Sequence, residues 1–471
     1  MELVKEHNAA EAQHMHWSLL GMQADRGVVK ASRFNAYQLL SQHPAFLDRI
    51  RWDEFEQSLK VRDFGFQISH WEEPEVVWND STTTEIAIWA ASEYEVDFSN
   101  SHIEDAAKTI GQQNRFNGCL EMIEAVEWDR IPRIDTFLEE YLGVKVDTFN
   151  ASQYMEAPAE AEQGLFEASK NRRALIRAYS RKTFLGAMAR LKWAKASRPI
   201  KVDTCLALYG EQGLGKSQTL RALCPRPKYF GGTPLDMSSK EAIQKIQSKL
   251  IYELCELAKR SKDISTEKAF LSEDVDLIRL PYQRSVSKLP RRCIFVATTN
   301  RVDLLKDATG NRRWWPVVAG ETFEKGQKID ILAIREIAPQ LWAEAAYILS
   351  PKPQGDFIGP IAPPQIAVER QLSGYEEFIW WLTPEQDAWR VEESQEFLQI
   401  HPWKRIIEGA VKGSDTITKG VWERILRELQ KEEAHLSPKD KTTIEMLLTQ
   451  LDYRKRRVTQ NGSRVVRWVK L

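Results

Sequence analysis

The segment Leu206–Leu220 has the sequence LALYGEQGLGKSQTL, which joins an apolar run, a glycine-rich turn and the start of a helix. The apolar residues from Cys205 to Tyr209 predict a short buried strand, and a helix is expected from Lys216 onward. Between them lies the pattern G-x-x-x-x-G-K-S, which in a strand–loop–helix setting is typical of a loop that binds nucleotide phosphates. An ordinary glycine-rich turn is the alternative, and the length and flanks of the pattern argue against it.

The residue types of this loop suit phosphate binding. Glycines let backbone N–H groups wrap around a β-phosphate, and the N-terminus of the following helix adds a positive dipole. Lys216 can reach the β- and γ-phosphates, and the Ser217 hydroxyl can bind Mg²⁺, so ATP and Mg²⁺ are the expected cofactors. The candidate nucleotide-binding residues are Gly210, Glu211, Gln212, Gly213, Leu214, Gly215, Lys216, Ser217 and Gln218.

The composition limits the classes of protein to consider. A chain of 471 residues is expected to form roughly two to four domains. Its 66 basic and 67 acidic residues nearly cancel, so any nucleic-acid-binding surface must be local. The five cysteines lack metal-binding spacing, which indicates reduced, mostly buried thiols and no zinc site. No apolar run approaches the length of a membrane span, so we expect a soluble, cytoplasmic protein with no membrane partner.

A second motif could complete a hydrolytic site. Lys249 to Glu253 predicts an apolar strand that ends in an acid, and Glu256 follows after Leu-Cys. Glu253 or Glu256 could lie opposite Ser217, bind the metal and orient the attacking water. Most such ATPases place Asp and Glu side by side, whereas here two Glu are three positions apart. Glu253 is the candidate metal residue beside Ser217. Which glutamate is the base and which holds the metal through water stays open, and a pair of surface acids is the alternative.

A third motif follows at Cys293–Asn300, CIFVATTN, where five apolar residues run into polar ones. Asn300 would lie at the carboxyl end of a parallel strand, where ligands bind, and could contact the γ-phosphate or the attacking water. Shortly beyond it, a predicted Gly-Asn turn presents Arg312 and Arg313 side by side. One of them could reach the γ-phosphate of a neighbouring subunit as an arginine finger. The alternative is that both arginines pair with acids inside their own fold.

These motifs together resemble the virulence-associated protein E family, P-loop ATPases of phages, plasmids and mobile islands that are similar to superfamily-three helicases within the AAA+ group. The resemblance covers about Trp128 to Pro316, with a looser match around Asn35 to Phe55. It implies that the glycine-rich loop is the Walker A motif, that Glu253 and Glu256 belong to the Walker B strand, and that Asn300 is sensor 1. It assigns the finger to Arg312 or Arg313.

The resemblance also implies a hairpin between the second and third motifs that lines a ring pore and grips single-stranded DNA. Its tip would be Tyr282–Lys288, with Lys268, Arg284 and Lys288 as candidate DNA contacts. A polar crossover loop is the alternative.

The C-terminal part predicts a further DNA contact. Ser350–Pro364 is rich in proline and indicates a linker. Helical patterns at Tyr375–Leu382, Thr418–Leu429 and Pro438–Leu451 then precede two strands joined by an Asn-Gly turn, which suggests a winged helix. Its basic strand contributes the candidate DNA contacts Arg454, Arg456 and Arg457, with protection of an edge strand against aggregation as the alternative explanation.

The predicted fold class is therefore α/β. We expect an N-terminal α+β region at 1–127, an AAA+-like P-loop ATPase core with a mostly parallel sheet flanked by helices at 128–349, a linker at 350–374 and a winged-helix-like domain at 375–471. The expected function is that of an ATP-dependent DNA helicase or translocase, a homo-oligomeric ring, with a hexamer favoured. It would act on single-stranded or forked DNA in replication of a mobile element, with priming left to a separate primase. The alternative is an ATP-gated initiator or regulator that does not unwind DNA.

Overall fold

The computed structural model describes residues 16–62, 75–147, 159–255, 264–279, 286–300, 311–350, 380–394 and 402–470, the last range with gaps at 430–435, 437–440, 442–443, 446, 450, 452 and 461–462. The chain forms two compact units. The first comprises Met1–Arg301 with Thr309–Gln395, and the second comprises Val302–Ala308 with Glu396–Leu471. Within the described part of the chain, no helix is both long and apolar enough to cross a membrane.

The N-terminal part of the first unit is a small α+β layer. Its sheet has the order β5-β4-β3-β6, formed by β5 (Glu75–Val77), β4 (Ser58–Arg62), β3 (Ile50–Asp53) and β6 (Arg115–Phe116). Three helices accompany it, α2 (Arg33–Gln42), α3 (Asp80–Tyr94) and α4 (Asn100–Gln113), together with the short hairpin β1 (Ala24–Asp25) and β2 (Val28–Val29). Helix α3 begins at Asp80, because the Asn79 side chain accepts from the Thr82 amide and caps the helix.

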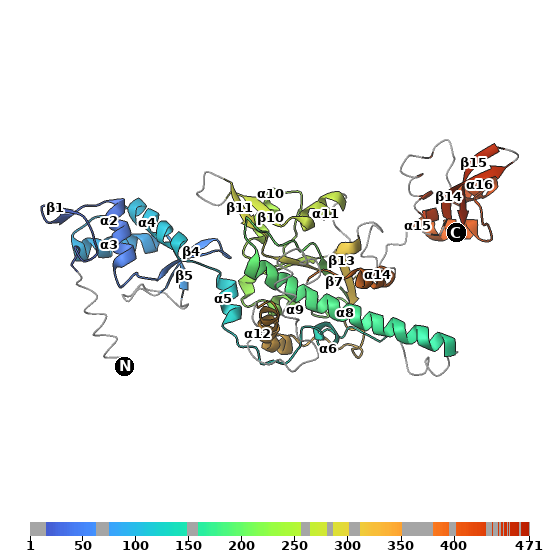
Figure 1. Ribbon diagram of the computed structural model, residues 1–471, viewed down its shortest axis with the longest axis horizontal. Helices are drawn as coiled ribbons and strands as arrows, with labels where there is room; N and C mark the ends of the chain where they lie inside the picture. Colours follow the sequence, from blue (N-terminus) through green and yellow to red (C-terminus); the bar gives the residue numbers. More distant parts are fainter. Residues whose placement is uncertain are drawn as a thin grey trace. The chain divides into compact units, whose positions relative to one another are not determined.

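A five-stranded parallel sheet forms the centre of the first unit (Figure 1). Its order is β13-β7-β12-β9-β8, with β13 (Trp314–Val318), β7 (Cys205–Tyr209), β12 (Ile294–Thr299), β9 (Ile251–Cys255) and β8 (Phe230–Gly231). Strands β7, β9 and β12 are apolar runs predicted from the sequence, as expected for parallel strands that helices cover. The structure thus confirms the α/β class with a mostly parallel sheet flanked by helices.

Helices α8 (Ala159–Trp193), α9 (Lys216–Leu223) and α12 (Ile331–Ile348) pack around one face of this sheet, with the short helices α5 (Gly118–Glu124) and α6 (Phe137–Glu140) beside them. Trp342 of α12 joins this core and donates its indole N–H to the carbonyl oxygen of Leu223 at 2.6 Å. On the other face, the Phe295 ring lies 5.7 Å from that of Phe270 on α11 (Ile264–Ser272). The helices therefore leave the carboxyl ends of the strands accessible.

An antiparallel hairpin of β10 (Val275–Ile278) and β11 (Ser287–Pro290) lies between β9 and β12 in the sequence. At its base, Arg291 pairs with Asp276 at 2.6 Å, and both side chains are 1% exposed. Arg291 also donates to the carbonyl oxygen of Phe270 and lies over the Phe270 ring at 4.6 Å. This buried pair anchors the hairpin to the end of α11.

Helix α14 (Pro384–Glu393) belongs to the first unit and packs against α8, whereas the boundaries expected from the sequence place it in 375–471. The described part of the helix predicted at Tyr375–Leu382, residues 380–382, is not helical. Thr383 and Gln386 form a capping box at the start of α14 instead, which sets its first turn at Pro384.

The second unit contains α15 (Pro402–Val411), α16 (Lys419–Glu428), helical residues between 441 and 449, and an antiparallel pair of strands. The pair is β14 (Tyr453–Gln460) and β15 (Ser463–Lys470), which confirms the two strands predicted on either side of the Asn-Gly sequence. Thr416 forms an isolated bridge to Val469 of β15. The apolar core of the second unit contains Ile407, Ile425 and Leu447.

Candidate active site

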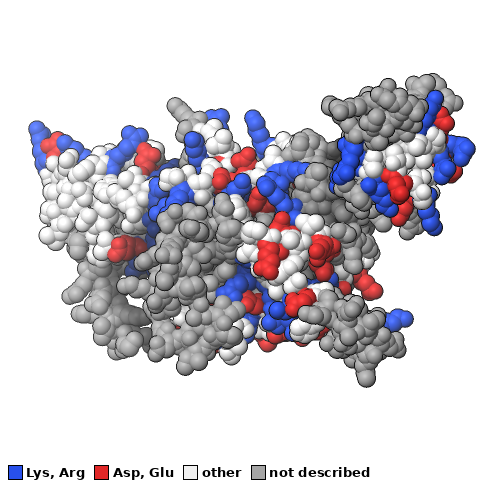
Figure 2. Space-filling view, turned by 45° about the vertical axis from the view of Figure 1, so that its right-hand side comes forward, with Lys and Arg blue, Asp and Glu red and all other residues white. Residues whose placement is uncertain are grey.

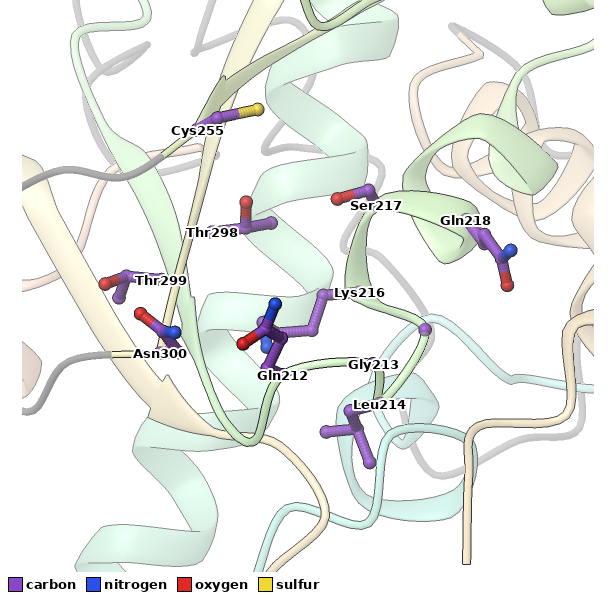
Figure 3. A pocket seen from close by; sticks show the side chains of 11 residues that line it. Gln212, Gly213, Leu214, Lys216, Ser217, Gln218, Cys255, Thr298, Thr299 and Asn300 are labelled. Atoms are coloured by element: carbon purple, nitrogen blue, oxygen red, sulfur yellow. The ribbon is translucent and has the colours of Figure 1, made fainter.

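The glycine-rich loop turns from β7 into α9 at the carboxyl edge of the sheet. Gly215 has φ +107° directly before α9, a conformation that L side chains rarely adopt. A Cβ at Gly210 would lie 2.9 Å from the carbonyl oxygen of Ala319, so a larger residue would displace the backbone. The loop borders a cavity of about 380 Å³, which Gln212–Gln218 line together with Cys255 and Thr298–Asn300 (Figure 3).

Lys216 is held inside the loop. Its side-chain ammonium donates to the carbonyl oxygens of Gly210 at 2.8 Å and Glu211 at 2.7 Å, and the residue is only 9% exposed. Gly210 and Glu211, two of the predicted binding residues, thus contact Lys216 through their backbone and do not line the cavity. Burial lowers the pKa of Lys216, and the charge of Glu253 opposes this shift. A preorganised cation therefore sits beside the cavity.

Glu253 lies next to Ser217. The Ser217 hydroxyl donates to Glu253 Oε1 at 2.5 Å, and the carboxylate is almost fully buried. The predicted strand ended at Glu253, but β9 begins at Ile251 and continues to Cys255, so the acid lies in the middle of the strand. Side chains alternate along a strand, and Glu253 shares its face with Ile251, which packs beside Leu220 of α9. This alternation brings the carboxylate to the start of α9.

Thr298 is a site residue that the sequence did not identify. Its hydroxyl donates to the same Oε1 atom of Glu253 at 2.6 Å, and its side chain is buried. In the parallel register, Val296 of β12 is the partner of Glu253 on β9, and Thr298 is the partner of Cys255. Thr298 lies two residues beyond Val296, on the same face of the strand, from which its side chain reaches Glu253. The run VATTN contains the threonine, but only this register shows that it reaches the glutamate.

Asn300 lies directly after β12, is exposed and lines the same cavity as Lys216. In Figure 3, Thr299 and Asn300 lie across the cavity from Ser217 and Gln218. Glu256, the second candidate acid, is outside the described residues. The structure therefore brings the loop, Glu253 and Asn300 together at one edge of the sheet.

The two predicted finger arginines have different surroundings. Arg313 donates to the Ser272 hydroxyl at 2.8 Å and lies 3.7 Å from an Asp203 carboxylate oxygen. Arg312 is exposed in the short 3₁₀ helix η3 (Asn311–Arg313). Neither arginine lines the cavity of its own chain. For Arg313, the structure shows the internal pairing that was the alternative from the sequence.

Lys288 lies on strand β11, opposite Leu277, and not in the turn that was predicted to carry it. Its side chain is exposed, and the neighbouring apolar residues Leu277 and Val286 are 58% and 63% exposed. Lys268 is half-buried on α11, and Arg284 is outside the described residues. The described face of the hairpin thus combines a cation with two exposed apolar side chains, which the sequence did not indicate.

The basic strand β14 places Arg454 and Arg456 at the surface of the second unit. Arg454 donates to the carbonyl oxygen of Thr449 at 2.8 Å, and Lys455 between them pairs with Glu445 at 2.9 Å. Arg457 is on the same strand, but its side chain is not described. On the face in Figure 2, Lys and Arg are interspersed with Asp and Glu, so any nucleic-acid contact depends on local clusters such as this one.

A parallel α/β sheet with a glycine-rich loop, a buried lysine and a hydroxyl–carboxylate pair at its carboxyl edge defines a class of proteins that bind ligands at this edge. The chain belongs to the virulence-associated protein E-like domain family, whose model matches residues 123–398, more than half of its length. This confirms the resemblance seen in the sequence.

Among solved structures, the A form apo structure of the NrS-1 C terminal region (305–718) has a TM-score of 0.45 and 12% identity, over 94% of this chain and 100% of that one. A structure described as SCCmec type IV Cch, active helicase, has a TM-score of 0.31 and 8% identity, over 89% of this chain and 97% of that one. These are distant similarities on which no further argument rests. Among curated proteins, no sequence matches the chain.

Proposed function

We propose that this protein is an ATPase whose nucleotide site is the loop Gly210–Gln218. The observation that carries the proposal is the cluster at one cavity: the enclosed Lys216 ammonium and the Ser217 hydroxyl hydrogen-bonded to Glu253. Backbone N–H groups at the start of α9 would bind the phosphates, and Lys216 would turn from the loop carbonyls to the β- and γ-phosphates. Asn300 would orient the water or the γ-phosphate from the opposite wall.

The oxygen donors present suit Mg²⁺. Magnesium in nucleotide sites is usually held by one or two protein oxygens, with phosphates and water completing the shell. Ser217 and Glu253 supply such a pair, and among the described residues no group of three His, Cys, Asp or Glu side chains forms a richer site. The ion would neutralise charge that develops on the phosphate oxygens. Glu253 would hold it, directly or through water, and Glu256 remains a candidate for the base that accepts the water proton.

We propose that Arg312 acts on a neighbouring copy of the chain. It is exposed and outside the cavity of its own chain, whereas Arg313 is engaged by Ser272 and Asp203. A site that requires Arg312 from a second chain favours a closed ring of like subunits, for which a hexamer is the preferred size.

DNA is the proposed substrate of this motor, in single-stranded or forked form. The hairpin offers the exposed Lys288 for phosphates and the exposed Leu277 and Val286 for bases and sugars. The second unit, from Glu396, has the order helix, bridge, two helices and hairpin, which supports a winged helix with Arg454 and Arg456 at its surface. Family membership supports a place in replication of a phage or mobile element, with a separate primase.

Strand displacement on a forked duplex tests this function, with Lys216→Ala as the inactive control. We expect ATP-dependent displacement by the unaltered chain and none by the variant. ATP hydrolysis that single-stranded DNA stimulates without any displacement would overturn the helicase proposal and leave the ATP-gated initiator or regulator. A complete absence of ATP hydrolysis would overturn both.

A further inference from the structure

A second cavity, of about 710 Å³, lies beside the nucleotide loop toward the edge strand β8. Ser217 and Gln218 line both cavities, so the first turn of α9 separates them. The remaining wall comes from the far side of α9, from β8, from α10 (Lys240–Ile246) and from the segment that leads into β9. Ser217, Gln218 and Glu253 of the proposed hydrolytic site lie at its border, but its other lining residues have no role in that site.

Three cations from separate elements line the cleft: Arg221 of α9, Lys245 of α10 and Lys249 before β9. The Lys249 ammonium donates to the carbonyl oxygen of Lys228 at 2.6 Å, and the Lys245 ammonium donates to that of Pro234 at 3.1 Å. The Arg221 guanidinium lies over the Phe230 ring at 5.1 Å. Each of the three charged groups is thus held by one contact. The ammonium groups of Lys245 and Lys249 each keep two further N–H donors for a ligand.

The acids nearest these cations act on them only at longer range, Asp236 on Lys245 and Glu56 on Lys249. Among the described residues, none of the three forms an ion pair with a carboxylate. Glu253 is the one acid of the cleft lining, and its 3% exposed carboxylate is already bound by Ser217 and Thr298. A concave surface whose lining holds three cations and one acid attracts anions, and its volume exceeds what a single phosphate would fill.

The cleft is also connected to the hairpin. Gln247 follows directly after α10, and its side-chain amide donates to Asp276 at 3.4 Å, at the base of β10. Asp276 lies on the buried face of the hairpin, so this contact ties α10 to the hairpin base. The three cations of the cleft come from three separate elements. An extended polyanion fits this arrangement better than a compact one does.

We infer that the cleft lined by Arg221, Lys245 and Lys249 binds the phosphodiester backbone of a nucleic-acid strand. This inference rests on the proposed nucleic-acid partner and adds a contact site to it. A strand bound here would touch the outer side of Ser217 and Gln218, and so lie next to the residues that would hold the metal. Nucleic acid could in this way influence hydrolysis through α9.

Fluorescence anisotropy of a labelled oligo(dT) tests the inference on the full chain, without nucleotide and over a range of salt concentrations. We expect Lys245→Ala with Lys249→Ala to weaken binding about 25-fold at about 0.1 M salt, since each lost phosphate contact to single-stranded DNA costs about 5-fold there. The slope of log K against log salt should become shallower by about 1.4. Lys245→Ala alone should weaken binding about 5-fold and make the slope shallower by about 0.7. Lys240 is an exposed lysine of the same helix outside the cleft, so Lys240→Ala should change neither quantity.

Binding of a fluorescent ATP analogue to the same variants shows whether they are folded and separates the inference from the proposed function. Unchanged analogue binding together with weaker oligonucleotide binding supports the cleft. If the cleft variants lose the analogue but keep the oligonucleotide, the cleft serves the nucleotide and the inference is overturned. Equal binding of the oligonucleotide by all variants, or an equal loss with Lys240→Ala, also overturns it. If the unaltered chain does not bind the oligonucleotide, the proposed DNA partner fails as well.

Discussion

Two hydroxyl groups share one carboxylate oxygen at the centre of the site. Ser217 and Thr298 both donate to Glu253 Oε1, at 2.5 and 2.6 Å. If Ser217 turned to a metal ion, as proposed, Thr298 would be the donor that remains to hold the carboxylate. A hydrogen bond to a charged group contributes about 1.5–3 kcal/mol, enough to keep one orientation of the side chain dominant. We therefore regard Thr298 as a positioning residue for Glu253.

Thr298→Val keeps the volume of the side chain and removes this donor. We expect kcat for ATP hydrolysis to fall roughly 10-fold or more, because a misoriented Glu253 would hold the metal and water poorly. KM for ATP should change little, because the phosphate-binding loop is intact. Steady-state kinetics check this, and Thr298→Ser should retain most of the rate. A rise in KM at constant kcat would show that Thr298 acts on nucleotide binding instead.

Glu344 makes stability depend on pH. Its carboxylate is 3% exposed and accepts the backbone N–H groups of Arg133 at 2.7 Å and Ile134 at 3.0 Å. Burial outweighs these bonds and raises the pKa of Glu344 to about 7. The folded chain therefore binds the proton more tightly than the unfolded chain does between the two pKa values. The free energy of unfolding should decrease as pH rises from about 4.5 to about 7.

Glu344→Gln keeps an acceptor oxygen and removes the charge. Denaturant unfolding of the variant should lose the part of the pH dependence that Glu344 contributes, so its stability relative to the unaltered chain should rise on going from about pH 5 to about pH 8. The expected gain is on the order of 2 kcal/mol. A constant difference between the two chains across this range would contradict the assignment.

At the scale of elements, the hairpin β10–β11 depends on the buried pair of Arg291 and Asp276. A buried guanidinium is tolerated because Asp276, the Phe270 carbonyl and the Phe270 ring surround it. Arg291 lies a few residues before β12 (Ile294–Thr299), which carries Thr298. The hairpin and the site strand therefore share one anchor, and movement of one requires adjustment of the other.

Asp276→Ala leaves the Arg291 charge buried and uncompensated, so it should lower the free energy of unfolding by about 3–5 kcal/mol. The double variant Asp276→Leu with Arg291→Met should recover much of this loss, because neither charge is then buried. Lys288→Ala on the same hairpin is the matched control and should change stability by less than about 0.5 kcal/mol, since its side chain is exposed. Denaturant unfolding compares the variants. A double variant as unstable as Asp276→Ala would argue against the charge as the cause.

At the scale of the whole molecule, the first unit joins the N-terminal layer to the edge of the central sheet. Phe55 packs edge-on against Tyr229 at 5.0 Å, beside β8, and Glu56 accepts from Lys228 at 2.8 Å. Arg292, directly before β12, pairs with Glu54 at 3.3 Å. The layer therefore contacts the sheet next to the segment that carries Arg291, the anchor of the hairpin. Residues 54–56 of the N-terminal layer thus contact the central sheet at β8 and just before β12, far away along the sequence.

The proposed sharing of a site between chains predicts complementation. Lys216→Ala and Arg312→Ala chains should each be inactive alone and should partly recover ATP hydrolysis when mixed, because a mixed interface pairs an intact loop with an intact arginine. Arg313→Ala is the contrasting variant. Arg313 contacts Ser272 and Asp203 within its own chain. Mixing Arg313→Ala chains with Lys216→Ala chains should therefore not recover ATP hydrolysis. Mixed assemblies of Lys216→Ala and Arg312→Ala without recovered activity would argue against a shared site.

The local features of this protein were predictable from its amino-acid sequence. The loop Gly210–Gln218 was predictable because glycine conformation, the lysine and the start of α9 all depend on residues within a short distance along the chain. The apolar runs of β7, β9 and β12 identified buried strands for the same reason, and the Asn-Gly turn identified the C-terminal hairpin. These elements and the α/β class follow from composition and spacing.

Contacts between side chains distant in the sequence became visible in the folded chain alone. The register of β12 on β9 brings Thr298 to Glu253, and the packing of η3 beside α11 engages Arg313 while leaving Arg312 exposed. The cleft of Arg221, Lys245 and Lys249 arises where three elements converge. Register and convergence depend on the packing of the whole sheet and its helices. No window of sequence around one residue contains that information, because strand neighbours lie tens of residues apart.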